Sequence, residues 1–407
     1  MASLSLEPLA ELDPARPDRF ADGSVNAIFD RLRREAPVHF CPASQFGPYW
    51  SVSRYHDIVE IESQPLLFSS QARHGGVSII DVNPNDSAGF ESFIMMDPPD
   101  HAGKRRAIAP AFAPSEMTRL SDAIRARTAA KLDSLPVGMP FDWVGTVSID
   151  LTIDMLAILF DFPWDERHQL RIWSDAITSL DMIINNPGER ARLLFEMAGR
   201  FFQLWQERAG QAPAPDLLSM MIHSADLGQM EAPEFMGNMA TLIVGGNDTT
   251  RNSMSGMIDA FSRWPAEWDT LVANPDLVAN AASEIIRWQC PAAHMRRTAT
   301  EDIEFKGHQF RKGDKIVLWY ASANRDEAVF DDGARFRVDR ENARRHLSFG
   351  HGIHRCVGAR LAELQLQILL SEMLARDMRV SAIGPVVREA HPFLNIIKAL
   401  PVIISRG

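Results

Sequence analysis

The chain has 407 residues, of which 46% are hydrophobic, and 42 basic against 53 acidic side chains give a formal net charge of −11 at pH 7. This composition allows a large core, and the excess of acid argues against nucleic acid as a partner. No segment has the run of about 18 apolar residues that a membrane anchor needs, and three cysteines are too few for a disulfide framework. We therefore expect a soluble cytoplasmic protein without a signal peptide.

The predicted elements are mainly helical. A strand-like run at 48–55 is followed by helical spacing of apolar residues over 119–134, 146–160, 190–208, 232–264 and 276–289. A second strand-like run at 302–320 turns at Lys306-Gly307 and Lys312-Gly313, as a small hairpin would. A helix at 357–376 and a strand-like tail at 395–404 complete the pattern. Because no linker or repeat marks a boundary, we expect one domain over 1–407, mainly α with small β sheets.

Two long stretches, 72–90 and 331–346, show no regular periodicity. Long irregular loops in a compact domain are often functional. We expect these two to contact a substrate or to support a cofactor.

The middle of the predicted 232–264 helix reads Thr241-Leu-Ile-Val-Gly-Gly-Asn-Asp-Thr-Thr250. Two adjacent glycines cost roughly 1 kcal/mol each relative to alanine inside a helix, and the residues after them are poor helix formers. The pattern predicts a local break with a functional reason. The alternative is close helix packing at Gly245-Gly246, with Asp248 in a surface salt bridge.

Glu284 and Arg287 place opposite charges on one face of the predicted 276–289 helix. Such pairs are common on solvated helices and contribute little there. Since the neighbouring Ile285, Ile286 and Trp288 are apolar, a buried pair is the better interpretation.

Cys356 lies in the stretch Ser348-Phe-Gly-His-Gly-Ile-His-Arg-Cys-Val-Gly358, directly before the last predicted helix. A helix N-terminus favours a thiolate, and Gly352 permits a turn that other residues resist. A lone cysteine is more often a small buried hydrophobe. A zinc site with His346, His351 or His354 is the other alternative, although no second ligand pair with zinc spacing is present.

The spacing Phe349-x-x-Gly352-x-x-x-Cys356-x-Gly358 resembles the haem-binding loop of the cytochrome P-450 family, in the form of its soluble bacterial members. The resemblance extends over nearly the whole chain, from Trp50 to the end. The strings at 245–256 and 294–302 are similar to those of bacterial terminal alkane and fatty-acid hydroxylases. The resemblance implies the cytochrome P-450 fold, with haem b buried between a long distal helix and the cysteine loop and with Cys356 as the iron ligand.

The same resemblance implies roles for further residues. Gly245 and Gly246 would make room for oxygen over the iron, Thr249 would hydrogen-bond it, and Asp248 would supply protons from solvent. Phe349 would shield the sulfur, and Gly358 would let the chain lie close to the haem. The haem propionates would be bound by His101, Arg105, Arg297 and His354, with Arg296 a close competitor for Arg297. Structural support would come from Glu284, Arg287 and Arg340.

The resemblance also implies a monooxygenase that inserts one atom of O2 into an unactivated C–H bond, by terminal hydroxylation of medium-chain alkanes or fatty acids. The substrate pocket would be apolar, lined by Val77, Ile79, Ile80, Thr241, Val244, Ala293, Met295, Phe393 and Leu394. The alternative substrate is a terpenoid, a polyketide or another compact hydrophobic molecule. A non-catalytic haem protein is a further alternative.

The chain carries no flavin, nicotinamide or Fe–S motif, so the electrons are expected from a 2Fe–2S ferredoxin and its NAD(P)H-dependent reductase. Residues 340–360 contain five arginines (340, 344, 345, 355 and 360) against a single acid, Glu341, and we expect some of them to form a basic docking surface for that partner. The alternative is that Arg340 and Arg345 are internal. A peroxide-driven enzyme is a second alternative, against which the Asp248-Thr249 pair counts.

Overall fold

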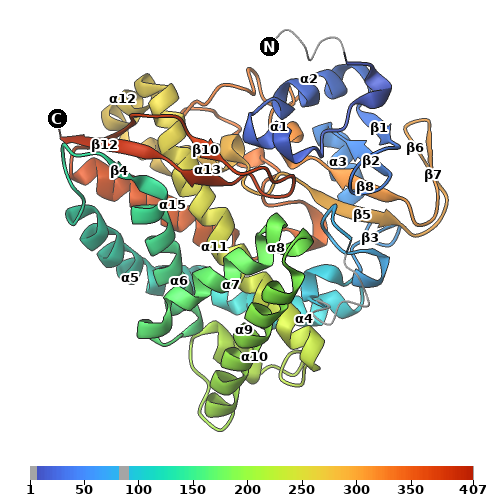
Figure 1. Cartoon of the computed structure of the whole chain (residues 1–407). Helices are drawn as coiled ribbons and strands as arrows, with labels where there is room; N and C mark the ends of the chain where they lie inside the picture. Colours follow the sequence, from blue (N-terminus) through green and yellow to red (C-terminus); the bar gives the residue numbers. More distant parts are fainter. Residues whose placement is uncertain (1–6, 82–90, 407) are drawn as a thin grey trace.

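The computed structural model describes residues 7–81 and 91–406, and most of them are helical (Figure 1). The longer helices are α2 (Val25–Glu35), α3 (Tyr55–Glu62), α4 (Asp100–Ile108), α5 (Pro114–Asp133), α6 (Ile149–Phe160), α7 (His168–Thr178), α9 (Pro187–Arg208), α11 (Ala232–Arg263), α12 (Pro265–Ala273), α13 (Val278–Gln289) and α15 (Ala359–Ala375). The shorter helices are α1 (Pro17–Ala21), α8 (Leu180–Ile184), α10 (Leu217–Ile222) and α14 (Tyr320–Ala323).

The strands form small sheets. The largest has the order β1 (Val38–Cys41), β2 (Tyr49–Val52), β8 (Lys315–Leu318), β5 (Met295–Ala299) and β3 (Phe68–Ser69). Its β2–β8 pair is parallel and its other pairs are antiparallel. A second sheet has the order β4 (Phe141–Asp142), β12 (Pro401–Arg406) and β9 (Met378–Ala382), and two hairpin-like pairs join β6 (Ile303–Phe305) to β7 (His308–Phe310) and β10 (Val387–Arg388) to β11 (Ile397–Ala399).

The predicted pattern of elements is largely confirmed. The six predicted long helices correspond to α5, α6, α9, α11, α13 and α15, and a π-helical turn over Val144–Ser148 leads into α6. The predicted hairpin is β6–β7, whose turn residues Lys306 and Gly307 both have positive φ. The irregular stretches contain only short 3-10 turns, at Ala72–His74 and Ala343–Arg345, while residues 82–90 of the first lie outside the described residues.

The predicted break in the distal helix is wrong. α11 is one α-helix from Ala232 to Arg263, and it passes without interruption through Gly245-Gly246. Polar side chains in this part of the helix bond back to the preceding turn without interrupting it. Thr249, Asn252 and Ser253 each donate to the carbonyl oxygen four residues earlier, at 2.8, 2.8 and 2.9 Å.

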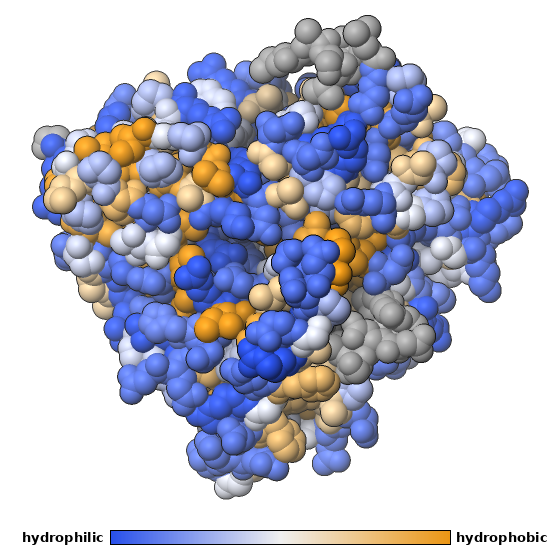
Figure 2. Space-filling model, viewed as in Figure 1, coloured by the Kyte–Doolittle hydropathy of each residue, from blue (hydrophilic) through white to orange (hydrophobic). Residues whose placement is uncertain are grey.

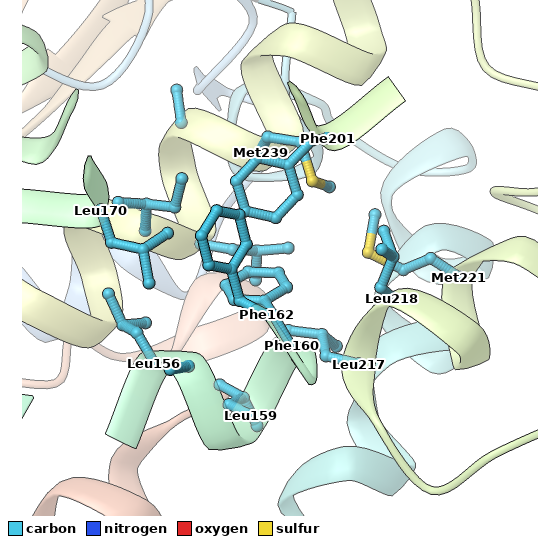
Figure 3. Packing of buried hydrophobic residues seen from close by; sticks show 14 of the residues in the cluster. Leu156, Leu159, Phe160, Phe162, Leu170, Phe201, Leu217, Leu218, Met221 and Met239 are labelled. Carbon is cyan, nitrogen blue, oxygen red and sulfur yellow. The ribbon is translucent and has the colours of Figure 1, made fainter. Parts of the chain in front are cut away.

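The hydrophobic core is divided among clusters on the two sides of α11. Figure 3 shows one of them, in which Phe160, Phe162 and Phe201 pack together near α11. The centroid of the Phe201 ring lies 5.2 Å from that of Phe160 and 5.3 Å from that of Phe162. Each such fully buried side chain stabilises the fold by about 1.5–3 kcal/mol. A second cluster joins α11 to α13, α15 and β12, and a third underlies the five-stranded sheet.

α11 is the element that places the candidate site. Figure 1 shows it crossing the middle of the molecule, with the five-stranded sheet on one side and α5, α6 and α15 on the other. In Figure 2 the apolar residues on the visible face form separate small groups among hydrophilic ones. Among the described residues, no helix is long and apolar enough to cross a membrane.

Candidate functional site

The loop before α15 turns sharply around Cys356. The Cys356 N–H donates to the Phe349 carbonyl oxygen at 2.8 Å, and Gly350 and Gly352 have φ values of +68° and +66°. A Cβ atom on Gly352 would lie only 2.4 Å from the backbone oxygen of Glu62 at the end of α3. Glycine is therefore needed at 352 for two reasons, the positive φ and the contact with α3.

The Cys356 sulfur is accessible to solvent, yet protein surrounds it closely enough to affect its ionisation. Burial raises the pKa of the thiol, while the Gly358 N–H, Arg105 and Arg355 lower it. Cys356 is therefore reachable from solvent while protein lies close around its thiol. Gly358 is the N-cap of α15, so the helix N-terminus stabilises a thiolate at this position.

Two imidazoles lie together, and one of them, His354, belongs to the loop before α15. The rings of His101, at the start of α4, and His354 are 4.4 Å apart. Both ring nitrogens of His354 and Nε2 of His101 are buried and have no partner among the described residues. Burial lowers the pKa of both, that of His354 to about 2. Unpaired buried N–H groups are costly, so these two side chains are suited to a ligand that supplies an acceptor.

Arg105 and Arg297 add two cations to this pair of neutral imidazoles. Arg105 is four residues after His101 on α4 and donates to the carbonyl oxygen of Arg355, next to the cysteine. Arg297 on β5 is buried and donates to Glu62 Oε1 at 2.7 Å. Arg296, its neighbour in the strand, points to the opposite face, where it binds Asp81 and the carbonyl oxygens of His74 and Gly75.

Glu62 is a functional candidate that the sequence reasoning missed. Besides Arg297, its carboxylate accepts hydrogen bonds from the Tyr320 hydroxyl at 2.6 Å and from the His351 N–H at 2.9 Å. Burial raises its pKa, and the Arg297 charge acts in the opposite direction. One carboxylate thus joins α3 to the strand that carries Arg297 and to the loop that carries the cysteine.

Glu284, Arg287 and Arg340 form a buried cluster of charged side chains. Arg287 bonds Glu284 at 2.6 and 2.7 Å, and Arg340 Nε donates to Glu284 Oε1 at 3.1 Å. The two arginines also bind backbone carbonyl oxygens in the irregular segment 324–335. Arg340 is internal, as one of the alternatives held, and it belongs to this cluster and not to a docking surface. Arg345, by contrast, is exposed.

One stripe of α11 is open although the helix is otherwise buried. Between Phe235 and Phe261 every residue is buried except Thr241, Val244, Gly245, Gly246 and Thr249, which recur at helical spacing. A Cβ atom on Gly245 would meet nothing within 4 Å, whereas one on Gly246 would lie 2.6 Å from Leu156 Cδ2 on α6. Gly245 therefore faces open space, and Gly246 permits close packing of α11 on α6.

Asp248 lies on another face of α11, directed at α7. It is fully buried, and its carboxylate accepts bonds from Ser174 at 3.1 Å and Thr178 at 3.2 Å and pairs with Arg251 at 2.5 Å. Arg251 also contacts Asp175, whose side chain is 41% exposed, and so connects Asp248 to the surface. Burial raises the pKa of Asp248, while Arg251 lowers it.

The predicted substrate residues come from four segments, of which 77–80, 293–295 and 393–394 lie side by side. Main-chain bonds join Ala293 to Phe393 and Arg296 to Val77, each at 2.8 Å. Among the predicted residues, Ile80, Thr241, Val244, Met295 and Phe393 are partly accessible. The remaining ones, Val77, Ile79, Ala293 and Leu394, are buried.

The residues present fit a haem. Cys356 can supply a thiolate, and the unpartnered imidazoles with Arg105 and Arg297 can bind two carboxylates. Among the described residues no group of three or more His, Cys, Asp and Glu side chains could hold a metal ion, so a zinc cluster around His346, His351 and Cys356 is not formed.

The chain is similar to known proteins over nearly its whole length. The sequence profile of the cytochrome P-450 family matches residues 267–377. Linalool 8-monooxygenase of Pseudomonas putida is 38% identical over 96% of this chain and 98% of its own, and a methyl-branched lipid omega-hydroxylase of Mycobacterium bovis is 30% identical over 97% and 95%. The solved structure of CYP153D17 from Sphingomonas sp. PAMC 26605 is 53% identical, with a TM-score of 0.92 over 97% of this chain and 99% of that one.

Proposed function

Because this chain belongs to the cytochrome P-450 family and is a monooxygenase that binds haem b through a cysteine thiolate, we propose that Cys356 is the iron ligand and that the enzyme hydroxylates the terminal carbon of medium-chain alkanes or fatty acids. The observation that carries the proposal is the open stripe of α11, which is formed by small or apolar side chains and ends at Thr249. A surface of small, uncharged side chains suits a hydrocarbon chain.

The haem, when bound, supplies the chemistry that activates dioxygen with two electrons and two protons. The protein residues hold the cofactor and direct the protons. His101, Arg105, Arg297 and His354 would bind the propionates, and Phe349 and Gly358 would enclose the sulfur.

Thr249 and Asp248 would handle the protons. The Thr249 hydroxyl now donates to the Gly245 carbonyl oxygen at 2.8 Å, and rotation about one bond would direct it into the open space beside Gly245. Asp248 would take up a proton at its carboxylate and pass it on, which the rise of its pKa on burial favours. Arg251 and Asp175 would connect that carboxylate with solvent.

The electrons would come from a 2Fe–2S ferredoxin. Arg344, Arg345, Arg355 and Arg360, which we call the arginine patch, are exposed, and the segment 340–360 that contains them and Cys356 has a single acid, Glu341. An acidic partner would be attracted to this patch in a chain of net charge −11. The three unpaired cysteines suit the cytoplasm, where such partners are found.

A terpenoid substrate is the second candidate, because linalool 8-monooxygenase is similar over nearly the whole chain. Turnover of octane, dodecanoic acid and linalool with ferredoxin, reductase and NADH separates the two. Terminal alcohols from octane or dodecanoic acid support the proposal, whereas products from linalool alone would replace it with the second candidate. Turnover with peroxide but none with the ferredoxin would show a peroxide-driven enzyme.

A further inference from the structure

His294 connects two segments that are far from it in the sequence. Its Nε2 accepts a hydrogen bond from the Ile79 N–H at 3.1 Å, and its Nδ1 contacts the Pro392 carbonyl oxygen at 3.0 Å. The side chain is completely buried, and its ring lies 4.8 Å from that of Trp319 and 5.3 Å from that of Phe393.

The two partners leave only one state for the imidazole. A backbone N–H can only donate and a carbonyl oxygen can only accept, so Nδ1 must carry the proton and Nε2 must be free. A doubly protonated ring would lose the bond to Ile79. Burial lowers the pKa of His294 to about 3, and the nearby His391, Arg296 and Lys315 act in the same direction.

The segments that His294 joins both carry proposed substrate residues. One holds Ile79 and Ile80, and the other holds Phe393 and Leu394. His294 itself stands in the chain between Ala293 and Met295, which belong to the same predicted lining. Each ring nitrogen of His294 therefore bonds the backbone of a different segment that carries proposed substrate residues.

We propose that His294 is a positioning residue that holds segments 77–81 and 391–395 at a fixed spacing, and thereby confines a substrate chain so that its end is oxidised. The inference rests on the proposed function, because it concerns the selectivity of that same pocket. His294 does not touch the substrate; it acts through the two backbones that it bonds.

Two substitutions separate the two bonds. His294→Asn places an amide N–H near the position of Nδ1, so it keeps the donor to Pro392 and loses the acceptor for Ile79. His294→Gln places an amide oxygen near the position of Nε2, so it keeps the acceptor for Ile79 and loses the donor to Pro392. His223→Asn is the matched control, since His223 is exposed at the end of α10.

The first readout is hydrogen exchange of the holoenzyme, which does not depend on activity. We expect His294→Asn to raise exchange in peptides covering 77–81, and His294→Gln to raise it in peptides covering 391–395. Unchanged exchange in both variants, or equal loosening of both segments in each, would overturn the inference.

The second readout is the ratio of terminal to subterminal alcohol formed from octane. We expect each variant to lower this ratio about fivefold, the equivalent of one neutral hydrogen bond of about 1 kcal/mol, while His223→Asn leaves it unchanged. A ratio equal to that of the wild type would contradict the inference. If the wild type itself forms no terminal alcohol, the proposed function fails while the exchange test still stands.

Nitrogen NMR of histidine-labelled wild-type enzyme covers the case in which neither variant folds. The account predicts that His294 stays in the neutral Nδ1–H form between about pH 5 and 8. An Nε2–H tautomer or a protonated ring in that range would overturn it.

Discussion

The carboxylate of Glu62 lies 2.7 Å from the guanidinium of Arg297, and the two side chains are only 1% and 4% exposed. The same carboxylate binds Tyr320 and the His351 N–H, so the ion pair connects the end of α3 with both β5 and the cysteine loop. The cation expected to bind a haem propionate is thus already held by a carboxylate of the protein.

Glu62→Gln tests how far this pair stabilises the site. The amide has a single acceptor oxygen, so it can keep the bond from Tyr320 or the bond from the His351 N–H but not both, and it leaves Arg297 buried without its counter-charge. We expect the free energy of unfolding of the holoenzyme in urea to fall by about 3 kcal/mol, and haem transfer to apomyoglobin to become faster. Glu60→Gln, in the exposed pair with Lys306, is the control and should change stability by less than about 1 kcal/mol. Equal effects of the two substitutions would mean that Glu62 is not the main counter-charge of Arg297.

Gly352→Ala should disrupt the cysteine loop. Its Cβ would need both a positive φ and a position 2.4 Å from the Glu62 backbone oxygen, which cannot rotate away. We expect a loss of more than about 3 kcal/mol in unfolding free energy and a reduced haem content. Gly313→Ala has the same kind of φ, +91°, but open space around it, so it should cost only about 1 kcal/mol and retain haem. Similar behaviour of the two variants would refute the role assigned to the contact with α3.

The adjacent glycines of α11 should respond differently to alanine. Gly245→Ala adds a methyl group that would meet no other protein atom within 4 Å, so it should leave the stability of the fold unchanged or slightly raised. Gly246→Ala places Cβ 2.6 Å from Leu156 Cδ2 and should destabilise the fold by about 1–3 kcal/mol. Urea unfolding of both holoenzymes measures the difference, and destabilisation by Gly245→Ala would show that its side of the helix is not open.

Stability should fall as the pH is lowered from 7 to 5. His294 and His346 are buried, and burial lowers the pKa of each to about 3, against 6.5 for an ordinary histidine. Below about pH 6.5 the unfolded chain therefore binds protons that the native chain does not, and each residue costs about 2 kcal/mol by pH 5. Urea unfolding at several pH values measures the loss, and it should be smaller in His294→Asn by about the share of one histidine. An equal loss in that variant would contradict the assignment.

The features that could be predicted from the sequence are those with local patterns. The spacing from Phe349 to Gly358 located the cysteine loop, and the Glu284–Arg287 pair was expected to be buried because its helix is apolar. The six long helices followed from the spacing of apolar residues. Residues that contact their neighbours in the sequence can be recognised from such local patterns.

The remaining features depend on contacts between distant segments. Glu62 and His294 carry no local signal, because their partners are 235 and 215 residues away. β1 and β9 were missed for a related reason, since their pairing with other strands decides their conformation more than their own sequence. The expected break in α11 was wrong because helix propensity was given more weight than packing against α6 and the back-bonding hydroxyls and amide.

The most direct test of the account is the absorption spectrum of the reduced, CO-bound protein for the wild type and for Cys356→Ser. The account predicts that the wild type has the strongly red-shifted Soret band of a thiolate-bound haem, and that the variant lacks this band while retaining its fold by far-UV circular dichroism. A variant with the wild-type band would contradict the claim that Cys356 is the ligand of the iron.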